Sequence, residues 1–167
     1  MNLLGLDTST AASAAAVLRS DGQAFAHDPT PAELTGRPAH SAELLPRVAA
    51  ALDDAGLDWG GLDAIAVGVG PGAFTGLRIG VTTARALAAA HDLELRPVSS
   101  LAALAAGIDA PLRLPLIDAG RGEVFAALYE GATELWPPFA ASPEAVAERV
   151  HQRGQAPNGA VLAAGNG

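Results

Sequence analysis

A glycine-rich segment directly behind an apolar run constrains this fold more than any other part of the sequence. Residues 70–80 read GPGAFTGLRIG, and they follow the apolar run 62–69. Four glycines in eleven residues indicate a backbone that turns sharply or lies very close to another surface. The arrangement predicts a buried strand that enters a tight turn and then an alanine-rich helix. In α/β proteins, ligands and partners gather at such a junction because helix N–H groups point out of it unpaired.

Two familiar nucleotide-binding motifs do not account for this segment. A Walker loop needs a lysine after its last glycine, but Leu77 stands at that position. The spacing of Gly68, Gly70 and Ala73 satisfies a loose dinucleotide fingerprint. However, Pro71 removes an N–H that a phosphate would use, so we give this match little weight.

Composition excludes several classes of protein. The formal net charge is −8, all ten basic residues are arginine, and there is no cysteine. An acidic chain without a basic run is a poor nucleic-acid binder by itself, and a chain without cysteine has neither disulfides nor thiolate metal sites. The first residues carry no basic region, and no apolar stretch approaches the length of a membrane span. We therefore expect a soluble, cytoplasmic protein that makes no membrane contact.

Hydrophobic periodicity and turn residues predict an order of strands and helices that begins twice. In chain order the predicted elements are strands over 2–6, 13–19 and 23–27, a polar loop over 28–38, a helix over 41–55, a strand over 62–69, a helix over 76–90, a strand over 93–98, a helix ending at 106, strands over 112–119, 123–130 and 132–136, a helix over 143–153, and a strand over 159–164.

Three antiparallel strands followed by alternating helices and strands, begun twice, indicate two lobes of one architecture. This order is typical of the actin-like ATPase (ASKHA) superfamily, whose two-lobed α/β proteins are built on ribonuclease H-like lobes. We predict an N-terminal actin-like lobe over 1–108 and a partial C-terminal lobe over 109–167. The second lobe is expected to be truncated, because the chain stops at a turn with no element behind it.

Four segments carry a resemblance to a known family. They are LLGLDTST at 3–10, HSAELLP at 40–46, GPGAFTGLRIG at 70–80 and DAGRGEVFAALY at 118–129. In this order and spacing the chain resembles the TsaB (YeaZ) family. The resemblance implies a non-catalytic subunit in the formation of N6-threonylcarbamoyladenosine at position 37 of tRNAs that read codons beginning with adenine. It also implies heterodimerisation with the catalytic paralogue TsaD and help from the ATPase TsaE. From the residues themselves we expect a homodimer in isolation and no cofactor.

The histidines separate a catalytic member from its partner. Catalytic paralogues resemble metalloenzymes in carrying a His-x-x-x-His pair, which one helical turn aims at a metal. Residues 98–103, at the corresponding place, read VSSLAA, and His27, His40, His91 and His151 lack such spacing. We therefore expect no metal site and no catalytic residue. The alternative is a stand-alone enzyme of the superfamily, either a phosphotransferase or an M22-type metallopeptidase homologue.

The polar residues Asp7, Thr8 and Ser9 at the end of the first strand have two interpretations. In this superfamily the first hairpin presents an acid and a hydroxyl to nucleotide phosphates, which makes the three residues weak cofactor-binding candidates. The interpretation that we favour is a strand-ending turn in which Asp7 and Thr8 cap backbone N–H groups. His40 is likewise expected to make a local hydrogen bond at a helix start.

Small residues at helical spacing in 76–90 predict an interface, because a helix that is apolar nearly all round needs two partners. One partner is its own sheet, and the other is the neighbouring helix together with a second subunit. The alternative is that this face packs only on its own sheet. The predicted interface residues are Leu44, Arg47, Gly76, Arg78, Gly80, Ala84, Arg85 and Ala88. Because the arginines are few and scattered, we expect the chain alone not to bind tRNA directly.

Overall fold

The chain forms two units, each built on one sheet. The computed structural model describes residues 1–153 and 160–167, and the units comprise Met1–Val98 and Ser99–Gly167. The lobe boundary predicted after residue 108 stays a prediction, since a division by contacts alone does not define a lobe. Among the described residues, no helix combines the length and the apolar character needed to cross a membrane.

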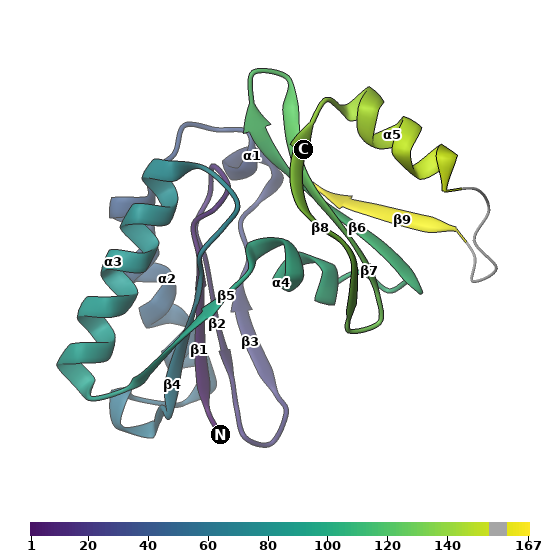
Figure 1. Cartoon of the computed structure of the whole chain (residues 1–167). Helices are drawn as coiled ribbons and strands as arrows, with labels where there is room; N and C mark the ends of the chain where they lie inside the picture. Colours follow the sequence, from purple (N-terminus) through teal and green to yellow (C-terminus); the bar gives the residue numbers. More distant parts are fainter. Residues whose placement is uncertain (154–159) are drawn as a thin grey trace. The chain divides into compact units, whose positions relative to one another are not determined.

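The sheet of the first unit has five strands in the order β3-β2-β1-β4-β5 (Figure 1). β1 pairs antiparallel with β2, and β2 with β3, whereas β4 and β5 run parallel to β1. β4 is buried along nearly its whole length, as expected for a central parallel strand. The strands are β1 (Leu3–Asp7), β2 (Ala14–Leu18), β3 (Ala24–His27), β4 (Ala64–Gly68) and β5 (Glu94–Val98).

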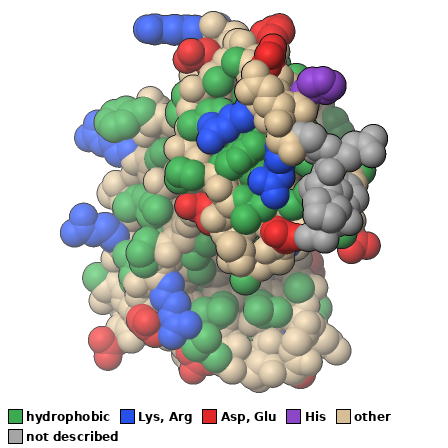
Figure 2. Space-filling model, turned by 45° about the vertical axis from the view of Figure 1, so that its right-hand side comes forward, with side chains coloured by type: hydrophobic (Ala, Val, Ile, Leu, Met, Phe, Trp, Pro, Cys, Tyr) green, Lys and Arg blue, Asp and Glu red, His purple; other side chains and the backbone are tan. Residues whose placement is uncertain are grey.

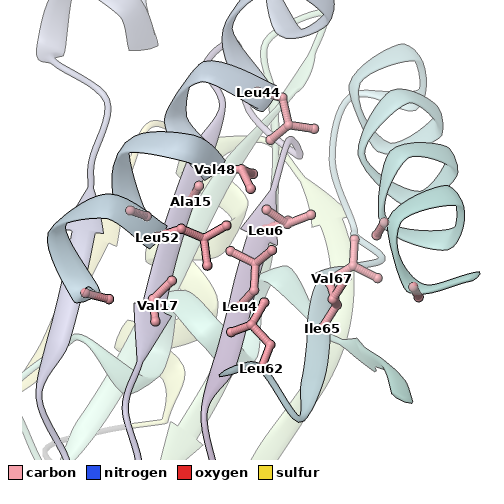
Figure 3. Packing of buried hydrophobic residues seen from close by; sticks show 14 residues of the cluster. Leu4, Leu6, Ala15, Val17, Leu44, Val48, Leu52, Leu62, Ile65 and Val67 are labelled. Atoms are coloured by element: carbon pink, nitrogen blue, oxygen red, sulfur yellow. The ribbon is translucent and has the colours of Figure 1, made fainter. Parts of the chain in front are cut away.

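Two long helices, α2 (His40–Ala55) and α3 (Phe74–His91), cover one face of this sheet. Alternation along β1 and β2 directs every second side chain into the core that they share with α2 and α3. Figure 3 shows Val48 and Leu52 of α2 pointing toward the strand residues of this cluster. Gly56 ends α2 in the left-handed conformation, which glycine adopts readily.

Two local predictions need correction. The segment 28–38 is not only loop, because α1 (Pro31–Leu34) forms inside it. Thr30 and Glu33 make a capping box at its start, with Pro31 in the first turn. The strand predicted over 132–136 is also longer: β8 extends over Thr133–Ala141, with two prolines that an edge strand tolerates. A 3-10 turn, η1 (Trp59–Gly61), precedes β4.

The second unit repeats the order of the first four strands of the first unit, without a counterpart of β5 among the described residues. Its sheet has the order β8-β7-β6-β9, with β6, β7 and β8 antiparallel and β9 parallel to β6. The α/β architecture predicted from the sequence is confirmed. The first residue of the last predicted strand, 159, lies outside the described residues. The further elements are α4 (Ser100–Ala106), β6 (Leu112–Gly120), β7 (Glu123–Glu130), α5 (Pro143–Gln152) and β9 (Val161–Gly165).

Candidate functional site at the glycine-rich segment

The glycine-rich segment joins β4 to α3 and is tied to the turn that follows β1. The backbone N–H of Ala73 donates to the carbonyl of Ser9 at 2.7 Å, and that of Val69 to the carbonyl of Val98 at 2.9 Å. Gly70 has a φ of 100°, which a residue with a side chain rarely adopts. The segment therefore brings the start of α3 directly against the residues after β1.

Gly76 and Gly80 are the points of closest approach. A Cβ atom at Gly76 would collide with the carbonyl oxygen of Thr8, and one at Gly80 with the Thr8 hydroxyl. That hydroxyl donates to the Gly76 carbonyl at 2.8 Å, and Thr8 is fully buried. The two glycines are therefore required by packing inside the first unit.

The polar turn after β1 makes the local hydrogen bonds of a capping turn. One carboxylate oxygen of Asp7 accepts from the Ser9 backbone N–H at 2.7 Å and from its hydroxyl at 2.5 Å. Ser9 is 2% exposed. The hydroxyls of Thr8 and Ser9 are thus engaged within the protein. Asp7 caps a backbone N–H as expected, whereas the Thr8 hydroxyl donates to the Gly76 carbonyl instead of accepting from an N–H. Their candidacy for a nucleotide remains a prediction.

His40 begins α2 beneath the glycine-rich segment. Its Nδ1 lies 3.0 Å from the hydroxyl of Ser13, the residue just before β2. The hydrogen bond therefore joins α2 to a distant segment of the chain and is not local. Its Nε2 is buried without a hydrogen-bond partner and lies close to Gly76. In residues 1–153 and 160–167, no group of three or more His, Asp or Glu side chains is placed to hold a metal ion.

The predicted interface residues fall into two groups. Five of them face inward. Four lie four residues apart on α3 and form one stripe, which packs against the unit's own turn and sheet. The fifth belongs to the core-facing side of α2. These five residues are therefore packed inside their own unit, as in the alternative that this face packs only on its own sheet. A partner could reach α3 only through its other side. The inward residues are Leu44, Gly76, Gly80, Ala84 and Ala88.

The three predicted arginines have different surroundings. Arg78 and Arg85 are exposed on α3. Arg47 is instead engaged in its own unit, since its guanidinium donates to the carbonyls of His27 and Asp28 and pairs with the Glu33 carboxylate. Hydrogen bonds from Thr30, together with Arg47, lower the pKa of Glu33. Arg47 therefore fastens the segment containing α1.

Exposed apolar residues that the sequence analysis missed lie beside the buried ones. Leu45 on α2 is 51% exposed and Phe74 at the start of α3 is 79% exposed. A step of 100° per residue places Leu45 off the core stripe of Leu44, which was visible in the sequence. α3 also carries a hollow of about 390 Å³. It is lined by Thr75, Arg78, Ile79, Thr82 and Thr83.

Charge is dispersed over the surface. Figure 2 shows arginine side chains distributed over the displayed face among hydrophobic and acidic ones, instead of forming a single continuous basic patch. The ion pairs of Arg19 with Asp21 and of Arg96 with Glu94 further offset positive charge locally. On the displayed face, the described residues form no basic stripe of the kind that tracks a nucleic acid.

Strand order, the covering helices and the glycine-rich helix start define the class: an α/β protein of the actin-like ATPase fold with ribonuclease H-like units. The family model described as "TsaD: tRNA N6-adenosine threonylcarbamoyltransferase" matches residues 33–153. The Escherichia coli K12 "tRNA threonylcarbamoyladenosine biosynthesis protein TsaB" is 37% identical over 174 residues, which cover 100% of this chain and 72% of that protein. The chain belongs to the TsaB (YeaZ) family.

Two further comparisons agree with this assignment. The Bacillus subtilis TsaB is 38% identical over 133 residues, covering 78% of this chain and 56% of its own. The solved structure "YeaZ from Pseudomonas aeruginosa" is 36% identical with a TM-score of 0.69, covering 84% of this chain and 65% of its own. The chain spans 39 to 72% of the length of four curated relatives that it matches.

Proposed function

We propose that this chain is a non-catalytic subunit in the formation of N6-threonylcarbamoyladenosine at position 37 of tRNAs that read codons beginning with adenine. It acts by heterodimerising with the catalytic paralogue TsaD, with TsaE as the accompanying ATPase. The observation that carries the proposal is the similarity to TsaB along the whole chain. Its contribution to the reaction is to hold TsaD in a competent conformation.

The non-catalytic role is supported by the two serines that stand where the catalytic paralogue has its histidine pair. Ser99 caps α4, since its hydroxyl accepts from the Ala102 N–H at 3.3 Å, and Ser100 is 4% exposed. These serines serve the helix start. The isolated chain is therefore expected to hydrolyse no ATP above background. ATP turnover that disappears in an Asp7→Ala variant would contradict this expectation.

The exposed side of α2 and α3 supports the heterodimer. Leu45 and Phe74 are large apolar side chains on helices whose inner faces already pack on the sheet. Exposed apolar side chains at helical surfaces are typical of protein–protein contacts. This surface would also serve a homodimer of the isolated chain, so the two assemblies should exclude one another.

Co-purification with the TsaD of the same genome tests the proposal. We expect a 1:1 complex by light scattering after size exclusion. Leu45→Asp should weaken it about tenfold or more, because an apolar contact is replaced by a charge that must be desolvated. Leu18→Asp is the matched control, since Leu18 is 43% exposed on β2, away from both helices. A wild type that forms no complex would refute the heterodimer.

A tRNA-binding experiment tests whether the chain contributes to the reaction only indirectly, through its partner. A −8 chain opposes the field of the phosphate backbone, so we expect no tRNA binding by the chain alone near physiological salt. An anisotropy titration with labelled tRNA measures this. Micromolar binding that weakens steeply with added salt would show that the folded surface provides a basic site.

A further inference from the structure

The two long helices of the first unit begin without a side-chain cap. Ala39 precedes α2 and Ala73 precedes α3, and neither residue offers a side-chain hydrogen bond to the first turn. Every other helix start among the described residues is capped by a side chain. These caps are Thr30, Asp58, Ser99 and Ser142. Because alanine is among the poorest capping residues, the starts of α2 and α3 keep N–H groups that can bind a ligand.

The start of α3 has the stronger positive field. The N–H groups of Phe74, Thr75 and Gly76 have no acceptor within the helix, and no backbone carbonyl in the described part of the chain pairs with them. The first turn of α3 contains no acidic residue, whereas that of α2 contains Glu43. Such a helix start acts like about half a positive charge and attracts anions.

A buried imidazole lies against this helix start. His40, the first residue of α2, is 3% exposed. A Cβ atom at Gly76, the third residue of α3, would lie 2.9 Å from the Nε2 of His40. That nitrogen has no hydrogen-bond partner, although Nδ1 of the same ring lies 3.0 Å from the Ser13 hydroxyl. An unpaired buried polar atom is costly, so its presence here indicates an incomplete site.

The ligand that suits this place is a compact anion. Two helix starts meet at the imidazole, and the positive ends of their dipoles repel a cation. Ser41, Phe74 and Thr75, in the first turns of the two helices, are exposed, so a small ligand can reach the N–H groups from solvent. A phosphate group carries several acceptor oxygens and can accept from donors on both helices at once.

We propose that the joint start of α2 and α3 binds a phosphate group. The N–H groups of Phe74 and Thr75 donate to its oxygens, and Nε2 of His40 lies at the floor of the site. The bound anion supplies the caps that Ala39 and Ala73 lack, and it joins the starts of the two helices. The site uses backbone donors and needs no arginine, and it does not depend on the proposed heterodimer.

Titration of the whole chain with inorganic phosphate, followed by amide NMR at an ionic strength held constant with sodium chloride, tests the inference. We expect saturable shifts of the Phe74 and Thr75 amide signals, and an unfolding midpoint that rises with phosphate concentration. Ala73→Asp places a carboxylate on the same N–H groups, so it should weaken phosphate binding about tenfold or more. Ala132→Asp is the control, with the same change at an exposed position of the second unit.

Two variants at position 40 test the role of Nε2. His40→Gln keeps a side-chain N–H and should retain most of the phosphate binding. His40→Leu removes both ring nitrogens and should weaken binding about tenfold. Unfolding midpoints without phosphate show whether either variant has lost its fold. If His40→Leu is folded and binds phosphate like the wild type, Nε2 has no part in the site.

A parallel titration with phenyl phosphate distinguishes free phosphate from a phosphomonoester. Tighter binding than that of inorganic phosphate, with the gain lost in Phe74→Ala, would identify a phosphomonoester whose organic part contacts the exposed ring. Equal affinities would identify free phosphate. The inference is overturned if neither compound gives saturable shifts at the start of α3, or if Ala73→Asp binds phosphate as tightly as the wild type and the control.

Discussion

In the first unit, two long helices cover a single face of the sheet. In the second unit, each face of the sheet is covered by one shorter helix. The first arrangement produces one core cluster shared by α2, α3 and the strands. In the second, alternation along β7 sends Ala127 and Tyr129 to the side of α4, and Ala126 and Leu128 to the side of α5. One strand order therefore supports two different ways of burying a sheet.

The turn between the first two strands shows the difference most clearly. In the first unit, Thr8 is buried against Gly76 and Gly80 of α3, and Ser9 against Gly72 just before that helix. In the second unit the corresponding turn, Gly120 to Gly122, has positive φ values, and a Cβ at either glycine would meet nothing within 4 Å. Glycine is thus required by close packing in one unit and by backbone conformation in the other.

The largest effect is expected from Gly76→Ala. Alanine favours a helix over glycine by about 1 kcal/mol, so the change would stabilise α3 if its glycine stripe were free. Because the added methyl group collides with Thr8, we expect a loss of about 3 kcal/mol of unfolding free energy. Urea unfolding measures it, with Trp136→Phe as background so that Trp59 reports on the first unit. Gly5→Ala, which has room and no left-handed φ in the same unit, is the control.

Removal of the Arg149 side chain should have the next largest effect. Its guanidinium lies 4.5 Å from the ring centroids of both Trp136 and Phe139, and this contact fastens α5 to β8. We expect Arg149→Ala to cost about 1–2 kcal/mol, detected by Trp136 fluorescence in a Trp59→Phe background. Arg149→Lys should retain part of the contact. An unfolding curve of Arg149→Ala identical to the wild type would mean that the stacking contributes nothing.

Gly122→Ala should cost less than Gly76→Ala, about 1 kcal/mol, because only a φ of 79° opposes it and no atom blocks the methyl group. Asparagine tolerates this conformation better, so Gly122→Asn should be milder still. The same urea experiment in the Trp59→Phe background compares the two. A cost equal to that of Gly76→Ala would refute the distinction between packing and conformation.

The smallest effect concerns two glutamates at helix starts, one in each unit. The backbone N–H and hydroxyl of Thr30, with Arg47, lower the pKa of Glu33 below 4.5, whereas its own N–H and the Ser142 hydroxyl lower that of Glu144. Each carboxylate therefore stabilises its unit above about pH 4.5, and that contribution is lost as the pH falls through the lowered pKa. Carboxyl NMR titration should show both below 4.5.

Added salt distinguishes the two glutamates. Because Arg47 contributes only to Glu33, 0.5 M NaCl should raise the pKa of Glu33 more than that of Glu144. Glu33→Gln should correspondingly reduce the loss of stability between pH 6 and pH 3. Equal salt responses would show that the ion pair with Arg47 does not influence the titration.

Local sequence patterns predicted most of the fold. Helical spacing placed α2 and α3 to within two residues of their observed starts and ends, and the strands predicted over 13–19 and 23–27 contain β2 and β3. The capping box at Thr30 was overlooked, although its residues were visible, because three prolines suggested a loop. The interface was harder to predict: the stripe of Gly76, Gly80, Ala84 and Ala88 has the same composition whether it meets a partner or its own turn.

The sequence by itself determined which residues form strands and helices, which turns need glycine, and the resemblance to the TsaB family, because these depend on neighbours along the chain. Only the tertiary structure decided which side of α3 is occupied, since Thr8 and Gly76 are 68 residues apart and their contact leaves no local trace. The same holds for the placement of Trp59, whose ring stacks on that of His91, a residue at the far end of α3. Long-range packing selects among faces that local chemistry leaves equivalent.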